Sequence, residues 1–235
     1  MSVTESEVGV GPGSAARRSK GYRGLAMEGS IARWYSRIRS GSEYVAQCAS
    51  QARELTKGLP DGAEILEVAS GPGLLAVELA RSGRFHVVGV DISRTFVEIS
   101  RKRAQDAGVG VRFVEGNASQ LPFPNGSFDL IVTQAAFKNF SEPQAAVDEM
   151  HRVLRPGGSA IIQDMRKGAT DESIREEVRG MKLGVVSSFM ARRTLLGLRR
   201  RAYTKEDFED FARRSPFESC TVTVDGIGQE VRLRK

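Results

Sequence analysis

The chain has 235 residues, 40% of them hydrophobic and 27% charged, which is enough for one domain with a single core. Its formal net charge of +6 favours anionic partners or simple solubility, and no apolar run approaches the ~18 residues of a membrane span. Cys48 and Cys220 form neither a disulfide framework nor a zinc pattern. We therefore predict a cytoplasmic protein with two reduced thiols and no metal. Residues 1–24 lack the apolar stretch of a secretory signal and are predicted to be a flexible tail.

Strand-like and helix-like segments alternate between residues 64 and 163. Short apolar runs predict strands over 64–69, 86–91, 111–115, 128–133 and 159–163. Helices are expected over 74–82, 95–107 and 143–154, and the last is preceded by Ser141 and Gln144 in the spacing of a capping box. This alternation predicts an α/β fold with a doubly wound, mostly parallel sheet.

The segments on either side extend this domain, which we expect to span 25–235. Two helices are predicted before the first strand, over 28–40 and 42–57. Residues 168–200 form a helix-prone insertion, and a further helix over 204–214 has Thr204 as its candidate cap. Polar and apolar residues then alternate around Asp225-Gly226, which predicts a hairpin and an antiparallel C-terminal strand.

A glycine-rich turn joins the first strand of the alternating region to its helix. Gly71 and Gly73 permit a sharp reversal and let a ligand lie directly on the backbone, next to the free N–H groups of the helix. In open α/β sheets, ligands bind at this carboxyl edge. Gly71, Gly73 and Ala76 also fit the dinucleotide fingerprint, with Asp91 placed to accept from ribose hydroxyls, so NAD is a competing ligand at this point.

Four further motifs decide between these ligands. The chain contains "ILEVASGPG", "VVGVDIS", "EGNASQLPFPNGSFDLIV" and "HRVLRPGG" in this order, from residue 65 to residue 158. With these motifs it resembles the class I S-adenosylmethionine-dependent methyltransferases, in particular their UbiE-like small-molecule subgroup. The resemblance implies S-adenosylmethionine as the cofactor and a Rossmann-like sheet of seven strands, the last one antiparallel.

The resemblance also implies a set of cofactor-binding residues. Ala69 stands where the family often has glycine, and Asn117 replaces a common aspartate. The implied set is Glu67, Ala69, Gly71 and Gly73 at the methionine end, Asp91 on the ribose, Ile92 on the adenine face, Asn117 and Ala118 at the adenine edge, and Gln134 toward the methionine moiety or the acceptor.

The methyl acceptor is expected to contact segments outside the common core. Candidate lid residues are Tyr22, Tyr35, Lys138 and Phe189, and the aromatic and methionine content of the insertion suits a small apolar or aromatic metabolite. The same side chains could simply bury the additional helices. No residue is identified as a catalytic base. The function predicted is methyl transfer to a small molecule by a monomer or homodimer that binds no nucleic acid.

Two other classes of function remain open from the residues alone. The basic segment 192–201 could bind RNA or an anionic lipid surface, either in a methyltransferase directed at such a partner or in a binding protein. The glycine spacing leaves a nicotinamide-dependent oxidoreductase as a third, weaker alternative.

Overall fold

The computed structural model describes residues 21–23, 27–181 and 184–235, so most of the predicted tail lies outside the described residues. The helices are α1 (Gly29–Ile38), α2 (Ser42–Leu55), α3 (Leu74–Ala80), α4 (Arg94–Ala107), the 3-10 turn η1 (Phe137–Asn139), α5 (Pro143–Val153), α6 (Asp171–Gly180), α7 (Val185–Arg199) and α8 (Lys205–Arg213). The strands are β1 (Glu64–Val68), β2 (His86–Asp91), β3 (Val111–Glu115), β4 (Phe128–Gln134), β5 (Leu154–Met165), β6 (Thr221–Asp225) and β7 (Gly228–Arg234).

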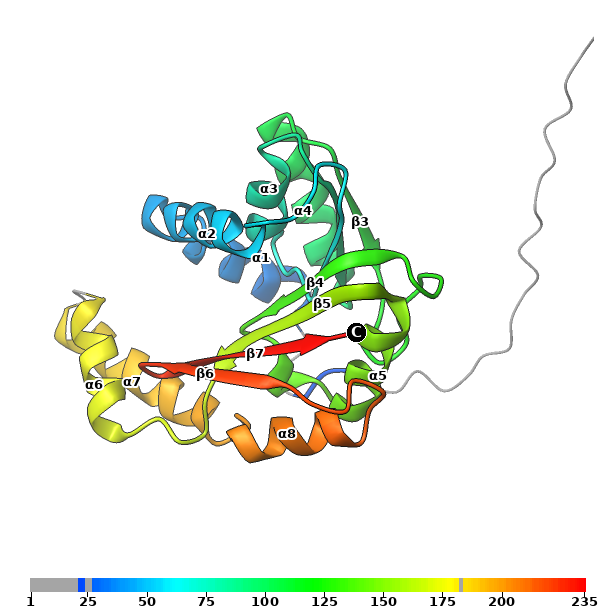
Figure 1. The fold of residues 1–235 in the computed structure, drawn as a ribbon. Coiled ribbons are helices and arrows are strands. Elements are labelled where there is room, and N and C mark those ends of the chain that lie inside the picture. Colours follow the sequence, from blue (N-terminus) through cyan, green and yellow to red (C-terminus); the bar gives the residue numbers. More distant parts are fainter. Residues whose placement is uncertain (1–20, 24–26, 182–183) are drawn as a thin grey trace, which may run out of the picture.

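The seven strands form one sheet in the order β3-β2-β1-β4-β5-β7-β6 (Figure 1). The first five are parallel in the doubly wound order, and β7 runs antiparallel to both of its neighbours. The predicted seven-stranded α/β fold with an antiparallel C-terminal strand is therefore confirmed. Because the chain reverses its winding direction at β1 and β4, a ligand site is expected where these two strands end.

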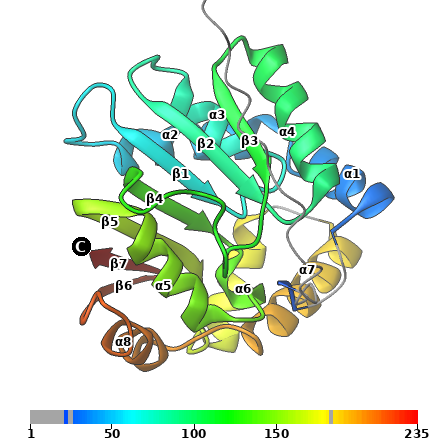
Figure 2. The same ribbon diagram turned by 90° about the vertical axis from the view of Figure 1, so that its right-hand side faces the viewer.

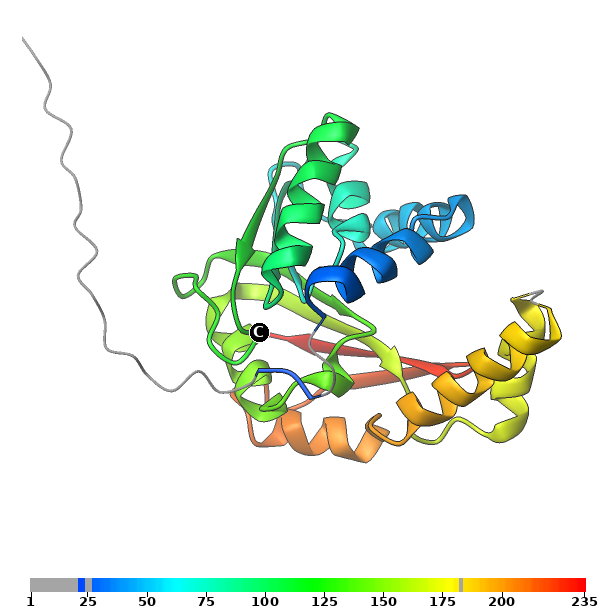
Figure 3. The ribbon, with the colours of Figure 1, turned by 180° about the vertical axis from the view of Figure 1, so that it is seen from behind.

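Each face of the sheet carries its own apolar core. Side chains from α2, α3 and α4 cover one face, which includes Ile65, Leu130 and Ile161. On the other face α5 and α8 pack with the fully buried Phe137. Figure 2 shows α5 and α8 in front of one end of the sheet, and Figure 3 shows α1 beside α4 from behind. The sheet therefore has helices on both faces, as the alternation of segments predicts.

The predicted insertion folds as the helical pair α6 and α7. The pair packs on the end of β5 through a small apolar cluster that includes Met165, Ile174 and Ala202. Figures 1 and 3 show the two helices projecting beside the β6–β7 turn. The N-terminal half of α7 exposes Val185 and Phe189.

One expected cap and one expected strand boundary are wrong, and another expected cap is confirmed. No capping box forms at α5, whose first residue is Pro143 and whose cap Glu142 makes no side-chain hydrogen bond. The helix ends at Val153, and the next strand begins at Leu154 rather than at 159, because Leu154 already pairs with β4 across a register shift. At α8, Thr204 forms a complete capping box with Asp207.

Candidate functional site

The turn after β1 contains three residues with a left-handed backbone conformation. Gly71 and Gly73 both have positive φ, at 51° and 75°. A Cβ on Gly73 would lie 2.5 Å from Ser100 Cβ, whereas nothing lies within 4 Å of a Cβ on Gly71. Ala69 also has a positive φ of 57°, a conformation that costs an L-residue roughly 1–2 kcal/mol. Gly73 is therefore required for packing, and the space beside Gly71 stays open to a ligand.

Asp91 at the end of β2 is tied to this turn. Its Oδ2 accepts from the Gly71 N–H at 2.7 Å, and its Oδ1 accepts from the Ser93 N–H at 2.8 Å. Burial raises the pKa of Asp91 to about 6. Because each carboxylate oxygen has a second lone pair, Asp91 can still accept from the two hydroxyls of a ribose.

Glu67 near the end of β1 is a buried carboxyl group without a full set of partners. Its Oε2 makes no hydrogen bond, and burial raises the pKa of Glu67 to about 8. A buried carboxyl oxygen without a partner can take a donor from a ligand, and a cationic donor favours its ionised form. The α-ammonium group of a methionine moiety is such a donor, so the residues of the turn fit S-adenosylmethionine.

The predicted adenine residues lie together, under the N-terminal segment. Ile92 keeps 41% of its surface exposed, and Ala118 packs against the core of the sheet. A Cβ on Gly21 would lie 2.7 Å from Ile92 Cδ1 and 2.6 Å from Asn117 Oδ1. Tyr22 forms a bridge with Phe140, which holds residues 21–23 in this place. The N-terminal segment thus forms a wall of the predicted adenine site.

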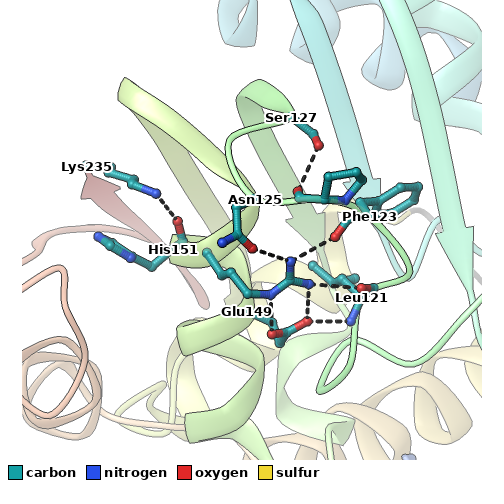
Figure 4. Close-up of polar contacts among 9 residues, drawn as sticks. Leu121, Phe123, Asn125, Ser127, Glu149, His151 and Lys235 are labelled. Carbon is teal, nitrogen blue, oxygen red and sulfur yellow. Dashed lines mark hydrogen bonds and ion pairs between the residues drawn. The ribbon is translucent and has the colours of Figure 1, made fainter.

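The motifs "LPFPNGS" and "HRVL" form one physical unit. Arg152 donates to the carbonyl oxygens of Leu121 and Phe123 and to Asn125 Oδ1, and it forms an ion pair with Glu149 (Figure 4). Glu149 Oε2 in turn accepts from the Leu121 N–H at 2.7 Å. This clasp fixes the loop between β3 and β4, which begins with the predicted adenine-edge residues.

On the acceptor side, the candidates differ in where their side chains lie. Gln134 ends β4 and donates to Gln51 of α2 at 2.7 Å. Tyr35 packs edge-on against Phe96 with ring centroids 5.9 Å apart. Phe189 is 59% exposed on α7.

Lys138 has a different place from the one predicted. Its side chain is only 4% exposed, and its ammonium group pairs with Asp164 Oδ1 and donates to the Ala135 carbonyl, both at 2.6 Å. The Lys138 N–H donates to Asp164 Oδ2. The ammonium group of Lys138 is therefore engaged by Asp164 and the Ala135 carbonyl. We assign Lys138 to stabilising the turn after β4, not to a lid over the acceptor.

The basic segment is partly engaged in internal contacts. Arg199 pairs with Asp171 at 2.6 Å and donates to the Ala169 carbonyl. Arg201 donates to the Arg23 carbonyl at 3.1 Å. These contacts join α6, α7 and the N-terminal segment, and the charge of Arg199 is compensated by Asp171.

Three residues of the carboxyl edge escape sequence reasoning. Gln51, Gln163 and Asp164 come from α2 and β5, and only the folded sheet brings them next to the end of β4. Gln163 and Asp164 did carry one signal, since they follow the apolar run of a predicted strand. Gln51 carried none, because an amide on an amphipathic helix is ordinary.

The sheet order and the glycine turn are those of a Rossmann-like α/β fold. Residues 66–162 match the family model described as "Methyltransferase domain". The chain is 40% identical over 99 residues to a demethylmenaquinone methyltransferase of Thermus thermophilus, covering 42% of this chain and 45% of the relative. It is 36% identical over 116 residues to the ubiquinone/menaquinone biosynthesis C-methyltransferase UbiE of Hahella chejuensis, covering 47% and 46%. The matched part thus spans less than half the length of these relatives.

Solved structures extend the likeness of the fold over most of the chain. A SAM-dependent methyltransferase from Aquifex aeolicus superposes with a TM-score of 0.64 at 17% identity, covering 86% of this chain and 97% of the other. Residues 66–162 are thus similar to a methyltransferase domain, and UbiE-type proteins are relatives of the chain by sequence. The predicted resemblance to S-adenosylmethionine-dependent methyltransferases is confirmed over these residues.

The described parts of the chain contain neither a membrane-spanning helix nor a cluster of metal-binding side chains. Among those residues no helix has the length and apolarity needed to cross a bilayer. The same residues contain no group of three or more His, Cys, Asp or Glu side chains able to hold a metal ion.

Proposed function

We propose that this chain transfers a methyl group from S-adenosylmethionine to a small apolar or aromatic acceptor. The observation that carries the proposal is the joint arrangement of Glu67, Gly71 and Asp91, which offers an ammonium acceptor, an open backbone and a ribose acceptor along one edge. The names of the two relatives support a finer choice, methylation at a carbon of a quinone-type ring.

Each residue of the site has a defined task in this proposal. Glu67 pairs with the ammonium of the methionine moiety, and Asp91 fixes the ribose while it holds the Gly71 turn in place. Ile92 covers one face of the adenine, beside the segment 21–23. The bound cofactor supplies an electrophilic methyl group on a sulfonium. The protein then contributes mainly by holding the acceptor in line with that group and excluding water.

Neither of the two histidines is placed at this edge as a general base. His86 Nδ1 lies 2.8 Å from Glu64 Oε1, at the opposite end of the sheet from the turn. His151 packs edge-on against Phe217 with centroids 4.8 Å apart. The proposal therefore needs an acceptor that is nucleophilic without full deprotonation by the enzyme.

Calorimetry with S-adenosylhomocysteine and with NAD tests the cofactor. We expect binding of the former that is weakened at least tenfold in Asp91→Ala and unchanged in Asp106→Ala, a surface aspartate paired only with Lys102. Methyl transfer from labelled S-adenosylmethionine to naphthoquinols then tests the acceptor class. Binding of NAD with none of S-adenosylhomocysteine would overturn the proposal.

A further inference from the structure

Four side chains form a continuous hydrogen-bonded row across the carboxyl edge. Gln134 Nε2 donates to Gln51 Oε1 at 2.7 Å, and Gln51 Nε2 donates to Gln163 Oε1 at 2.7 Å. Gln163 Nε2 donates to Glu230 Oε2 at 2.8 Å. We call these four residues the glutamine relay. The other oxygen of Glu230 pairs with Arg232 Nε at 2.6 Å, so the relay ends on a carboxylate that is held by a cation.

The carboxylate end dictates the direction of the relay. An ionised carboxylate can only accept, so Gln163 must turn its NH₂ toward Glu230 and its oxygen toward Gln51. Gln51 must then turn its NH₂ toward the Gln163 oxygen and its own oxygen toward Gln134, so Gln134 donates. Gln134 Oε1 consequently has no partner among the described residues, and it is not one of the fully buried unpartnered atoms. Each bond polarises the next, which strengthens this free carbonyl as an acceptor.

The free carbonyl lies beside the methionine end of the predicted cofactor site. Glu67 of β1 pairs in register with Val132 of β4. Two residues later, Gln134 ends β4 at the same edge of the sheet where Ala69 begins the turn after β1. Cys48 lies one turn before Gln51 on α2. Burial, and then the charge of Glu67, raises the pKa of Cys48 to about 11, so α2 also lies next to Glu67.

The unpartnered oxygen of Glu67 already provides the acceptor for the cofactor's ammonium, which leaves the Gln134 carbonyl for another donor. We propose that Gln134 Oε1 accepts a hydrogen bond from an O–H or N–H group of the methyl acceptor and thereby positions it. This inference rests on the proposed function. A carboxamide does not take up the proton, so Gln134 is a positioning residue that selects acceptors with a donor beside the methylated atom. Glu230, at the far end of the relay, sets that preference.

Exchanging the carboxylate for an amide tests the direction. In Glu230→Gln the new side chain can donate to Gln163, so the relay is free to reverse and Gln134 can present its NH₂ instead. The matched control is Glu98→Gln, which also replaces a glutamate paired with an arginine, on the surface of α4. The probes are 1-naphthol, which has an O–H donor, and 1-methoxynaphthalene, which has none. Their affinities are measured on protein saturated with S-adenosylhomocysteine.

We expect the wild type and Glu98→Gln to bind 1-naphthol about five- to tenfold more tightly than 1-methoxynaphthalene. Glu230→Gln and Gln134→Leu should bring this ratio close to one, with unchanged affinity for S-adenosylhomocysteine. A ratio in Glu230→Gln equal to that of the wild type would overturn the inference, as would a wild-type ratio of one or less.

Side-chain amide NMR gives a readout without an acceptor. Glu230→Gln should shift the Nε2–H₂ signals of Gln163, Gln51 and Gln134, with an effect that decreases in this order. Unchanged signals at Gln51 and Gln134 would show that no relay exists. Failure of the wild type to bind S-adenosylhomocysteine would count against the proposed function alone, because the NMR result does not depend on it.

Discussion

The carboxylate of Asp91 accepts a 2.7 Å hydrogen bond from the backbone of Gly71, twenty residues earlier in the chain. Asp91, the residue predicted to bind the ribose, therefore also holds the glycine turn in place. This double role changes what a mutation at Asp91 is expected to do, because it removes a ligand contact and loosens the loop that approaches the ligand.

Asp91→Asn and Asp91→Ala should therefore differ in a defined way. The amide retains one acceptor and can keep one of the two backbone contacts, whereas alanine loses both. We expect a loss in S-adenosylhomocysteine affinity of about tenfold for Asp91→Asn and about a hundredfold for Asp91→Ala. Calorimetry measures the affinities, and thermal unfolding checks that both variants fold. Equal affinities of the two variants would contradict the role of Asp91 in holding the turn.

Gly71 and Gly73 should respond differently to the same substitution. In Gly73→Ala the new Cβ meets Ser100 and Phe113, and the positive φ is unfavourable as well, so we expect a loss of about 2–4 kcal/mol of unfolding free energy. Gly71→Ala meets nothing within 4 Å and should cost only about 1 kcal/mol, while it weakens cofactor binding. Chemical denaturation and calorimetry on both variants check this. A Gly71→Ala protein with full affinity would place the cofactor elsewhere.

Arg152 should contribute to stability through the loop that it clasps. In Arg152→Lys, the planar fork that reaches two carbonyls and Glu149 is lost, and we expect a loss of about 2–3 kcal/mol. Arg94→Lys, which affects only an exposed pair with Glu98, should change stability by less than about 0.5 kcal/mol. Denaturant unfolding measures both, and equal losses would contradict the role of the clasp.

The same contact has a consequence at acid pH. The hydrogen bond from Arg152 holds the pKa of Glu149 below its ordinary value. A carboxyl group whose pKa is lowered in the folded state stabilises the fold above its unfolded pKa, and this contribution is lost as the pH falls. Wild type should therefore lose stability below about pH 4.5 more steeply than Glu149→Gln does. If the free energy of unfolding falls equally steeply with decreasing pH in the wild type and in Glu149→Gln, this role of Glu149 is contradicted.

Local patterns predicted the strands and the glycine turn well because their causes lie close together in the sequence. The turn at Gly71 and the cap at Thr204 each depend on residues within a few positions. The contacts that define the acceptor side do not. Gln51 and Gln163 are 112 residues apart in the chain, and only the strand order makes them neighbours.

Lys138 shows the same limit within a single motif. Its apolar neighbours Phe137 and Phe140 are both buried, as their residue type predicts. The lysine between them is also buried because Asp164, on the next strand of the sheet, compensates its charge. The segment "AAFKNF" does not contain Asp164, so the local sequence does not predict the ion pair. From that segment alone, a buried lysine cannot be distinguished from a lysine in a lid.

Glu67 should make cofactor binding release a proton. With its pKa raised to about 8 by burial, the carboxyl group is mostly protonated at pH 7 in the unliganded protein. An ammonium placed beside Oε2 favours the ionised form and lowers this pKa, so the proton leaves on binding. Calorimetry at pH 7 in buffers of different ionisation enthalpy should show release approaching one proton for wild type and close to none for Glu67→Gln.

The same group governs the pH dependence of the unliganded fold. Between about pH 4.5 and about pH 8 the folded protein holds a proton on Glu67 that the unfolded chain has lost. Stability should therefore fall as the pH rises through this window, and Glu67→Gln should remove the fall. Saturating S-adenosylhomocysteine should remove it as well, because its ammonium compensates the charge. A wild-type curve that keeps its slope with the ligand bound would show that the ammonium lies away from Glu67 and would reassign the methionine end of the site.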